Sequence, residues 1–171
     1  MSVALSDNKF LAILCLMLFF AGCSSTNKAM LEHVGKPAPI VRLELLNGER
    51  VVLDEYRGKT VALIFWATWC SASRPVIEYA GKLARKYAGR GDIAFIAVSL
   101  DKLSDYDKLR ERIKYRNLDS MIHAFSGNGA DDEAAYVLGV KKMPAIFIID
   151  KTGVIRKAGS SKSLLDSVTE Y

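Results

Sequence analysis

Two short runs of apolar residues constrain the fold of this chain more than any other feature. Thr60–Trp66 reads TVALIFW and Ile93–Leu100 reads IAFIAVSL. In each run, side chains that would point to opposite sides of a strand are apolar, which is typical of a strand buried on both faces. The sheet that contains these strands therefore needs a layer of other structure above it and another below it.

Helical and strand patterns alternate through the rest of the chain. Asn47-Gly48 lies between the alternating segments Ile40–Leu46 and Glu49–Leu53, which predicts a β-hairpin. Further strands are expected at 121–125, 145–150 and 154–157, and helices at 71–88, 104–116, 131–138 and 163–170. This order indicates an α/β fold, with a central mixed β-sheet flanked by helices and an N-terminal β-hairpin extension.

The cysteine count and the charge exclude several classes of protein. The 171 residues include three cysteines, too few for a disulfide framework, and two histidines, His33 and His123, far apart in the sequence. We therefore expect no metal site and no cofactor. A net charge of +5, from 24 basic and 19 acidic residues, is a weak argument for a nucleic-acid partner, and we expect none.

The N-terminal segment accounts for two of the three cysteines. Phe10–Gly22 is an uncharged apolar run, too short for an ordinary membrane-spanning helix but suited to an export signal. Phe20-Ala21-Gly22-Cys23 resembles a bacterial lipobox, which implies that residues 1–22 are a signal peptide containing Cys15 and that Cys23 carries lipid. The alternatives are an uncleaved anchor or a plain secretory signal. Lipidation would attach the protein to a membrane surface.

We accordingly expect a tether at 23–36, one folded domain at 37–171, and a monomer. The lipobox resemblance places the protein in a bacterial cell envelope on the periplasmic side. The residue after Cys23 is Ser24 rather than Asp, which favours the outer membrane. One free thiol, Cys70, remains in the folded domain.

The segment Trp66-Ala67-Thr68-Trp69-Cys70 resembles the active-site entry of the thioredoxin-like superfamily. The resemblance is strongest to its TlpA-like group of membrane-tethered thiol-disulfide oxidoreductases, which are related to the AhpC/TSA redoxins. Three further segments, in the family's order, support it. These are Gly35–Pro39, Arg57-Gly58-Lys59, and Met143–Asp150 followed by Gly153. The resemblance implies a cis peptide bond before Pro144. It also implies that Trp69, Met143 and Pro144 border the substrate site.

The position of Cys70 favours a reactive thiol. The residue lies where a buried strand gives way to the start of a helix, and unpaired backbone N–H groups there favour a negative charge. Arg74, one turn further along, would add positive charge if its side chain faces the sulfur.

The family's CxxC motif is changed in this chain to Cys70-Ser71-Ala72-Ser73. Ser73 should lie beside Cys70, where its hydroxyl can hydrogen-bond the thiolate, but it cannot form a disulfide. Two acidic positions of the family are apolar here, Ile64 and Val76. Glu78, eight residues after Cys70, has the wrong helix phase to replace them directly.

Three functions remain open. The first is a monothiol thiol-disulfide oxidoreductase, in which an external thiol must resolve the mixed disulfide formed by Cys70. Its partner would be a client protein bearing a thiol or a disulfide, or a glutathione-like small thiol. The second is a non-catalytic module that binds peptides or proteins. The third is a peroxidase that uses Cys70.

Overall fold

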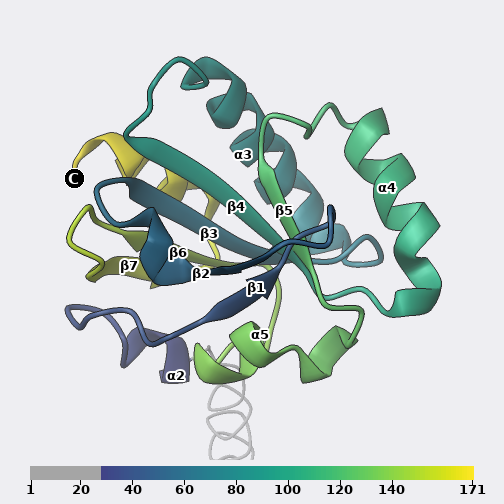
Figure 1. Ribbon diagram of the computed structural model, residues 1–171, viewed down its shortest axis with the longest axis horizontal. Coiled ribbons are helices and arrows are strands. Elements are labelled where there is room, and N and C mark those ends of the chain that lie inside the picture. The colour runs from purple at the N-terminus through teal and green to yellow at the C-terminus, as the bar shows by residue number, and fades with distance from the viewer. Residues whose placement is uncertain (1–27) are drawn as a thin grey trace, which may run out of the picture.

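In the computed structural model, which describes residues 28–171, five strands form one twisted sheet (Figure 1). Their order across the sheet is β5-β4-β3-β6-β7. The bounds are β3 (Thr60–Trp66), β4 (Ile93–Ser99), β5 (Ile122–Phe125), β6 (Ala145–Ile149) and β7 (Ile155–Gly159). β3 pairs in parallel with β4, and β4 with β5, whereas β6 is antiparallel to both β3 and β7. The expected mixed sheet is thus confirmed.

The apolar runs form the middle of this sheet. Every residue of β3 and of β6 is buried, as is every residue of β4 except its first. Alternate side chains of β3 belong to two separate cores, because successive residues of a strand point to opposite faces. The continuous apolar sequence therefore results from the position of β3 between two layers.

One layer consists of α3 (Arg74–Lys86), α4 (Tyr106–Tyr115) and the 3₁₀ helix η5 (Lys162–Thr169). The other contains α2 (Lys28–Leu31), α5 (Glu133–Val137) and the hairpin of β1 (Arg42–Glu44) and β2 (Arg50–Val52). Figure 1 shows α3 and α4 on the opposite side of the sheet from α2 and α5. The hairpin was expected, and β1 pairs antiparallel with β2.

All four expected helices differ in part from the sequence-based expectation. The one expected at 104–116 begins as the 3₁₀ turn η3 (Leu103–Asp105) before α4, and the one expected at 131–138 is the shorter α5. The helix expected at 71–88 begins as a 3₁₀ turn, η2 (Ser71–Ser73), before α3 starts. Pro75 lies in the first turn of α3, where its missing N–H costs no hydrogen bond. The final helix is 3₁₀ throughout η5, and the tighter helix packs Leu165 and Val168 against the core.

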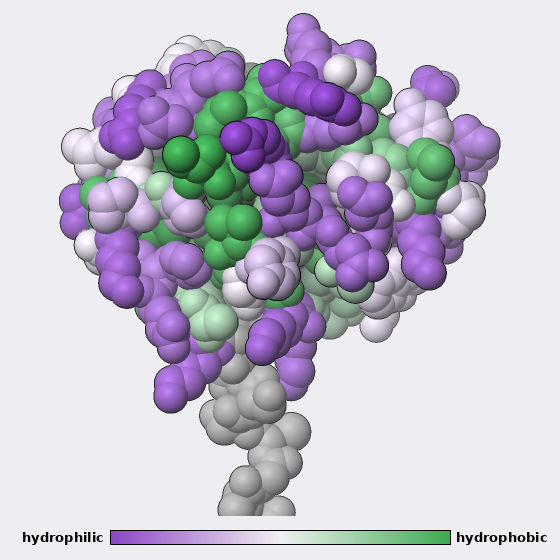
Figure 2. Space-filling model, turned by 60° about the horizontal axis from the view of Figure 1, so that its bottom comes forward, coloured by the Kyte–Doolittle hydropathy of each residue, from purple (hydrophilic) through white to green (hydrophobic). Residues whose placement is uncertain are grey.

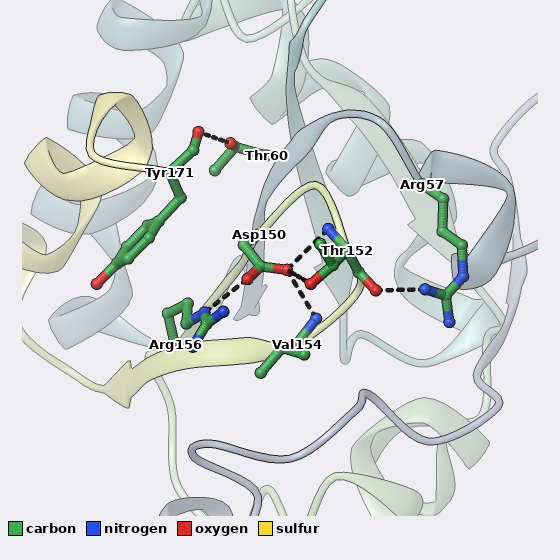
Figure 3. Close-up of polar contacts among 7 residues, drawn as sticks. All are labelled: Arg57, Thr60, Asp150, Thr152, Val154, Arg156 and Tyr171. Carbon is green, nitrogen blue, oxygen red and sulfur yellow. Dashed lines mark hydrogen bonds and ion pairs between the residues drawn. The ribbon is translucent and has the colours of Figure 1, made fainter.

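The turn between β6 and β7 is held by one buried carboxylate (Figure 3). One oxygen of Asp150 accepts hydrogen bonds from Thr152 N at 2.9 Å, Thr152 Oγ1 at 2.6 Å and Val154 N at 2.9 Å, while the other accepts from Arg156 Nε at 2.5 Å. Arg57, just before β3, donates to the Thr152 carbonyl oxygen. The turn also needs Gly153, whose φ is +83°.

A further polar contact involves Tyr171, whose carbonyl oxygen accepts a hydrogen bond from Thr60 Oγ1 at 2.7 Å. This bond attaches the last residue of the chain to the first residue of β3, as Figure 3 also shows.

Asp150 should make folding sensitive to acid. Burial raises the pKa of Asp150, but the hydrogen bonds from Thr152, Val154 and Arg156 outweigh it and lower the pKa to about 2. An unfolded Asp has a pKa of about 3.9, so the stabilisation is complete above that value and is lost as the pH falls towards 2. In urea unfolding, Asp150→Asn should therefore cost more free energy at pH 6 than at pH 3. The exposed Asp131→Asn is the control, and an equal cost at both pH values would contradict this role.

Candidate functional site

Cys70 lies in the loop that follows the carboxyl end of β3. Its N–H donates to the Ala67 carbonyl oxygen at 3.1 Å, and its own carbonyl oxygen accepts from Ser73 N at 3.2 Å. Cys70 caps η2 rather than an α-helix, because α3 begins only at Arg74. The side chain is half-buried, and it is a free thiol. The strand-to-helix position expected from the sequence is confirmed, with a 3₁₀ turn inserted between the thiol and α3.

A fully buried residue that the sequence analysis missed, Asp101, holds this loop in place. Its carboxyl oxygens accept from Thr68 N at 3.0 Å and from Thr68 Oγ1 at 2.7 Å. Ser99 Oγ, at the end of β4, donates to the same carboxyl group at 2.7 Å. The signal was present in the sequence, since Asp101 follows the buried β4 run just as Thr68 follows β3. In parallel strands paired Trp66 to Ser99, these residues meet at one edge of the sheet.

The expected cis peptide bond joins Met143 to Pro144, in a segment that lies beside the thiol. The Met143 carbonyl oxygen lies 3.7 Å from Cys70 Sγ and accepts its hydrogen bond. Trp66 is buried in the core, whereas Trp69 is 60% exposed beside the site.

Trp69 and Met143 line a groove of about 570 Å³ that also includes Leu100, Tyr136 and Val140. We call it the aromatic groove. Tyr136 is 85% exposed, so the groove presents a large aromatic side chain to solvent. Figure 2, which turns the side of α2 and α5 towards the viewer, shows apolar side chains surrounded by hydrophilic ones on this face. Such a surface can bind an extended apolar segment.

Ser73 is buried beside the site, and the bond expected from its hydroxyl was to a Cys70 thiolate, whereas here Cys70 Sγ is the hydrogen-bond donor. The Ser73 hydroxyl has no hydrogen-bond partner, and the contact of Cys70 Sγ is with Met143 instead. The physical reason is that a protonated thiol is a donor, for which the backbone carbonyl of Met143 supplies an acceptor. The Ser73 hydroxyl is therefore a buried hydrogen-bond donor without an acceptor.

Arg74 lines a narrow cleft together with Cys70, as does Glu78. Two further arginines reach this cleft from α4 and its C-terminal end, Arg112 and Arg116, and Arg116 forms an ion pair with Glu78. The sequence analysis gave Glu78 the wrong helix phase to replace the family's acidic residue directly. The structure nevertheless places Glu78 in the same cleft as the thiol, where Arg116 neutralises its charge. We call this hollow the arginine cleft.

The two acidic positions of the family are apolar and buried here. Ile64 has no exposed surface in β3, and Val76 is 4% exposed in α3. Neither supplies a group that could take up a proton near Cys70.

Three further questions from the sequence concern a metal site, a membrane-spanning helix and the lipid on Cys23. In residues 28–171 no three His, Cys, Asp or Glu side chains are grouped so that they could hold a metal ion. Within the same range, no helix has the length and apolar character needed to cross a membrane. Cys23, the expected lipidation site, lies outside the described residues.

Comparison with known proteins identifies similar sequences and folds. The AhpC/TSA family model matches residues 34–158. The thiol:disulfide interchange protein DsbE of Tatumella citrea is 30% identical over 151 residues, which cover 85% of this chain and 76% of that protein. The thiol-disulfide oxidoreductase ResA of Geobacillus thermodenitrificans is 32% identical over 131 residues, covering 72% and 67% of the two chains.

Among solved structures, a thiol-disulfide oxidoreductase from Bacteroides fragilis matches with a TM-score of 0.69 and 24% identity. The match covers 79% of this chain and 98% of that one. It shows that the two chains share a thioredoxin-like fold.

Replacing the buried carboxyl group of Asp101 should loosen the active-site loop. An amide would replace one of the two accepting oxygens by an NH2 group that faces a donor of Thr68 or Ser99, and Asp101→Asn should lower the free energy of unfolding by about 1–3 kcal/mol. Thr68→Val, which removes one of the donors, should cost less. Chemical denaturation measures both, with the exposed Asp107→Asn as control. Equal stabilities of the Asp101 and Asp107 variants would contradict this role.

Proposed function

This chain belongs to the AhpC/TSA family, and on that premise we propose that it is a monothiol thiol-disulfide oxidoreductase acting through Cys70. The single observation that carries the proposal is a half-buried free thiol at the family's reactive position with a serine, Ser73, where the second thiol would be. The cis peptide bond before Pro144 and the carbonyl contact from Met143 supply the family's geometry around that thiol.

The exchange needs three steps. The Cys70 thiolate attacks a client disulfide, a new S–S bond forms to one client sulfur, and the other sulfur leaves as a thiolate. An external thiolate then attacks the Cys70 sulfur of this mixed disulfide and releases the client's second thiolate. A second external thiolate restores Cys70 and leaves as part of a small disulfide. The client disulfide is thereby reduced and two external thiols are oxidised, with Ser73 forming no bond to sulfur.

Formation of the thiolate changes the hydrogen bonding at the site. The Met143 carbonyl can accept from a thiol but offers nothing to a thiolate, which needs donors. The Ser73 hydroxyl, buried and without a partner, is a donor that becomes useful at this moment. Arg74, exposed at the edge of the same cleft, contributes positive charge. Ser73 thus acts on the charged form of Cys70, which agrees with the absence of its bond in the thiol form.

The aromatic groove is the proposed site for a client protein. Its apolar walls include Trp69 and Met143, the two residues next to the thiol and to Pro144. A client segment bound there in an extended conformation would pair with the Met143 backbone and bring its sulfur to Cys70. We propose that the protein works as a monomer, without a cofactor, metal or nucleic-acid partner.

The proposed location is the periplasmic side of a bacterial envelope, with the outer membrane favoured. The support is the lipobox-like segment ending at Cys23 and the polar residues after it. Lipid on Cys23 would hold the domain at a membrane surface, while the thiol faces the periplasm. Of the tether expected at 23–36, residues 28–31 instead form α2, whose Met30 packs into the core.

The second candidate, a module that binds proteins without catalysis, has one specific observation in its favour. The thiol lacks both a neighbouring thiol and the family's two carboxylates, replaced by Ile64 and Val76, while the aromatic groove is retained. The peroxidase alternative has less support. Ala67 occupies the position where peroxidases of this superfamily carry a hydroxyl, and the Thr68 hydroxyl donates to Asp101.

Reaction with oxidised glutathione tests the proposal against both alternatives. In a full-length chain with Cys15 and Cys23 changed to Ser, the folded protein should form a stable adduct on Cys70 at least tenfold faster than the same chain unfolded. The adduct should persist because Ser73 cannot displace it. Intact mass follows the product, with Cys70→Ser as the control. No enhancement over the unfolded chain would favour the binding module, and rapid sulfenic acid formation with peroxide would favour the peroxidase.

Restoring the second thiol tests whether the rest of the site is competent. Ser73→Cys should form an internal disulfide with Cys70, abolish the stable glutathione adduct and catalyse insulin reduction by dithiothreitol, measured as turbidity. Ser73→Ala is the matched control and should gain none of these. A variant that forms the disulfide yet stays inactive would show that the apolar residues Ile64 and Val76, rather than the missing thiol, limit the reaction.

A further inference from the structure

The arginine cleft is lined by three arginines but by only one acidic side chain, that of Glu78. Arg116 is neutralised by Glu78, but neither Arg74 nor Arg112 forms an ion pair or a side-chain hydrogen bond in the described part of the chain. Arg112 is nevertheless half-buried. The cleft that Cys70 lines therefore has two uncompensated positive charges.

A second observation concerns a buried hydrogen-bond donor on one of the residues that line this cleft. The Nε of Arg116 is buried and has no acceptor, although its neighbouring nitrogen contacts Glu78. A buried donor without an acceptor is costly, and so is a half-buried guanidinium without a counter-charge. The planar guanidinium group presents paired donors that match the two oxygens of a carboxylate.

The size and position of the cleft limit what can bind there. Cys70 itself lines it, whereas the aromatic groove is lined by the neighbours Trp69 and Met143. The cleft is narrow, and its free space of about 10 Å³ holds about one water molecule, so a larger group would bind at its mouth, where Arg74 is exposed. With a client in the aromatic groove, the arginine cleft is a separate approach to the sulfur.

From these features, and resting on the function proposed above, we propose that the external thiol is a small molecule bearing a carboxylate, which Arg74 and Arg112 bind. The bound thiolate attacks the Cys70 sulfur of the mixed disulfide, and the client sulfur leaves with the electron pair of the broken S–S bond. The same contacts would favour small disulfides that carry carboxylates when Cys70 is the attacking group. Neutral and cationic thiols would gain nothing from the cleft.

Three symmetric disulfides of different charge test the proposal. These are dithiodiglycolate, hydroxyethyl disulfide and cystamine, which are anionic, neutral and cationic. For each disulfide, the rate constant is measured with Cys70 in the full-length chain in which Cys15 and Cys23 are changed to Ser. It is then divided by the rate constant of the same disulfide with mercaptoethanol under the same conditions. This ratio removes the intrinsic reactivity of the disulfide. We expect dithiodiglycolate to be favoured over hydroxyethyl disulfide roughly tenfold at low salt, with cystamine disfavoured and the preference reduced at high salt.

Matched variants assign the preference to the cleft. Arg112→Gln should remove most of it, and Arg112→Lys should retain part. Arg110→Gln is the control, because Arg110 lies on the same helix, α4, but stacks over Tyr106 and lines a different hollow. An equal loss in the Arg110 and Arg112 variants would mean that only net charge matters, and would overturn the proposal.

Two further results separate this inference from the function on which it rests. No charge preference, with a fast reaction of hydroxyethyl disulfide, would overturn the carboxylate site alone and leave the monothiol function standing. No enhanced reaction with any of the three would overturn the monothiol function.

An acidic peptide disulfide that outcompetes dithiodiglycolate, and loses this advantage in Arg112→Gln, would assign the cleft to a client protein and overturn the small-molecule assignment.

Discussion

The burial of β3 on both faces and both edges is the constraint on which the rest of the structure depends. Its seven residues are paired with β4 on one side and β6 on the other, and none is exposed. Such a strand cannot shift its register by one residue without exchanging the side chains of two cores. Its carboxyl end is thereby fixed in space, and the loop that carries Cys70 begins at a defined point.

The loop is then set by two contacts from neighbouring strands. Asp101, just past β4, binds Thr68 on one side of the thiol, and Met143, just before β6, contacts the sulfur itself. Both contacts come from strands that pair directly with β3. The sheet thus brings together residues that are more than 30 positions apart in the chain and surrounds Cys70 with groups from three separate segments.

The chemistry around this thiol differs from that of a dithiol enzyme in a consistent way. The second thiol is replaced by Ser73, and the family's acidic positions are filled by apolar side chains that extend the core. Charge near the sulfur comes instead from arginines on α3 and near the end of α4, with Glu78 partly balancing them. In the proposed monothiol mechanism these replacements belong together, since a site with one thiol has no second proton to transfer but still has to receive a thiol from outside.

The sequence by itself determined the strands, the hairpin, the mixed sheet and the position of the free thiol Cys70 after the first buried strand. Apolar runs and Asn47-Gly48 act through local periodicity and turn chemistry, which a linear pattern records, and the Trp66–Cys70 segment was recognised by its resemblance to a family. Only the tertiary structure showed the contact of Asp101 with Thr68, the unpartnered hydroxyl of Ser73, and the meeting of Arg74 with Arg112. Each depends on how separate elements pack side by side, and the spacing of residues along one element holds no information about the element that faces it.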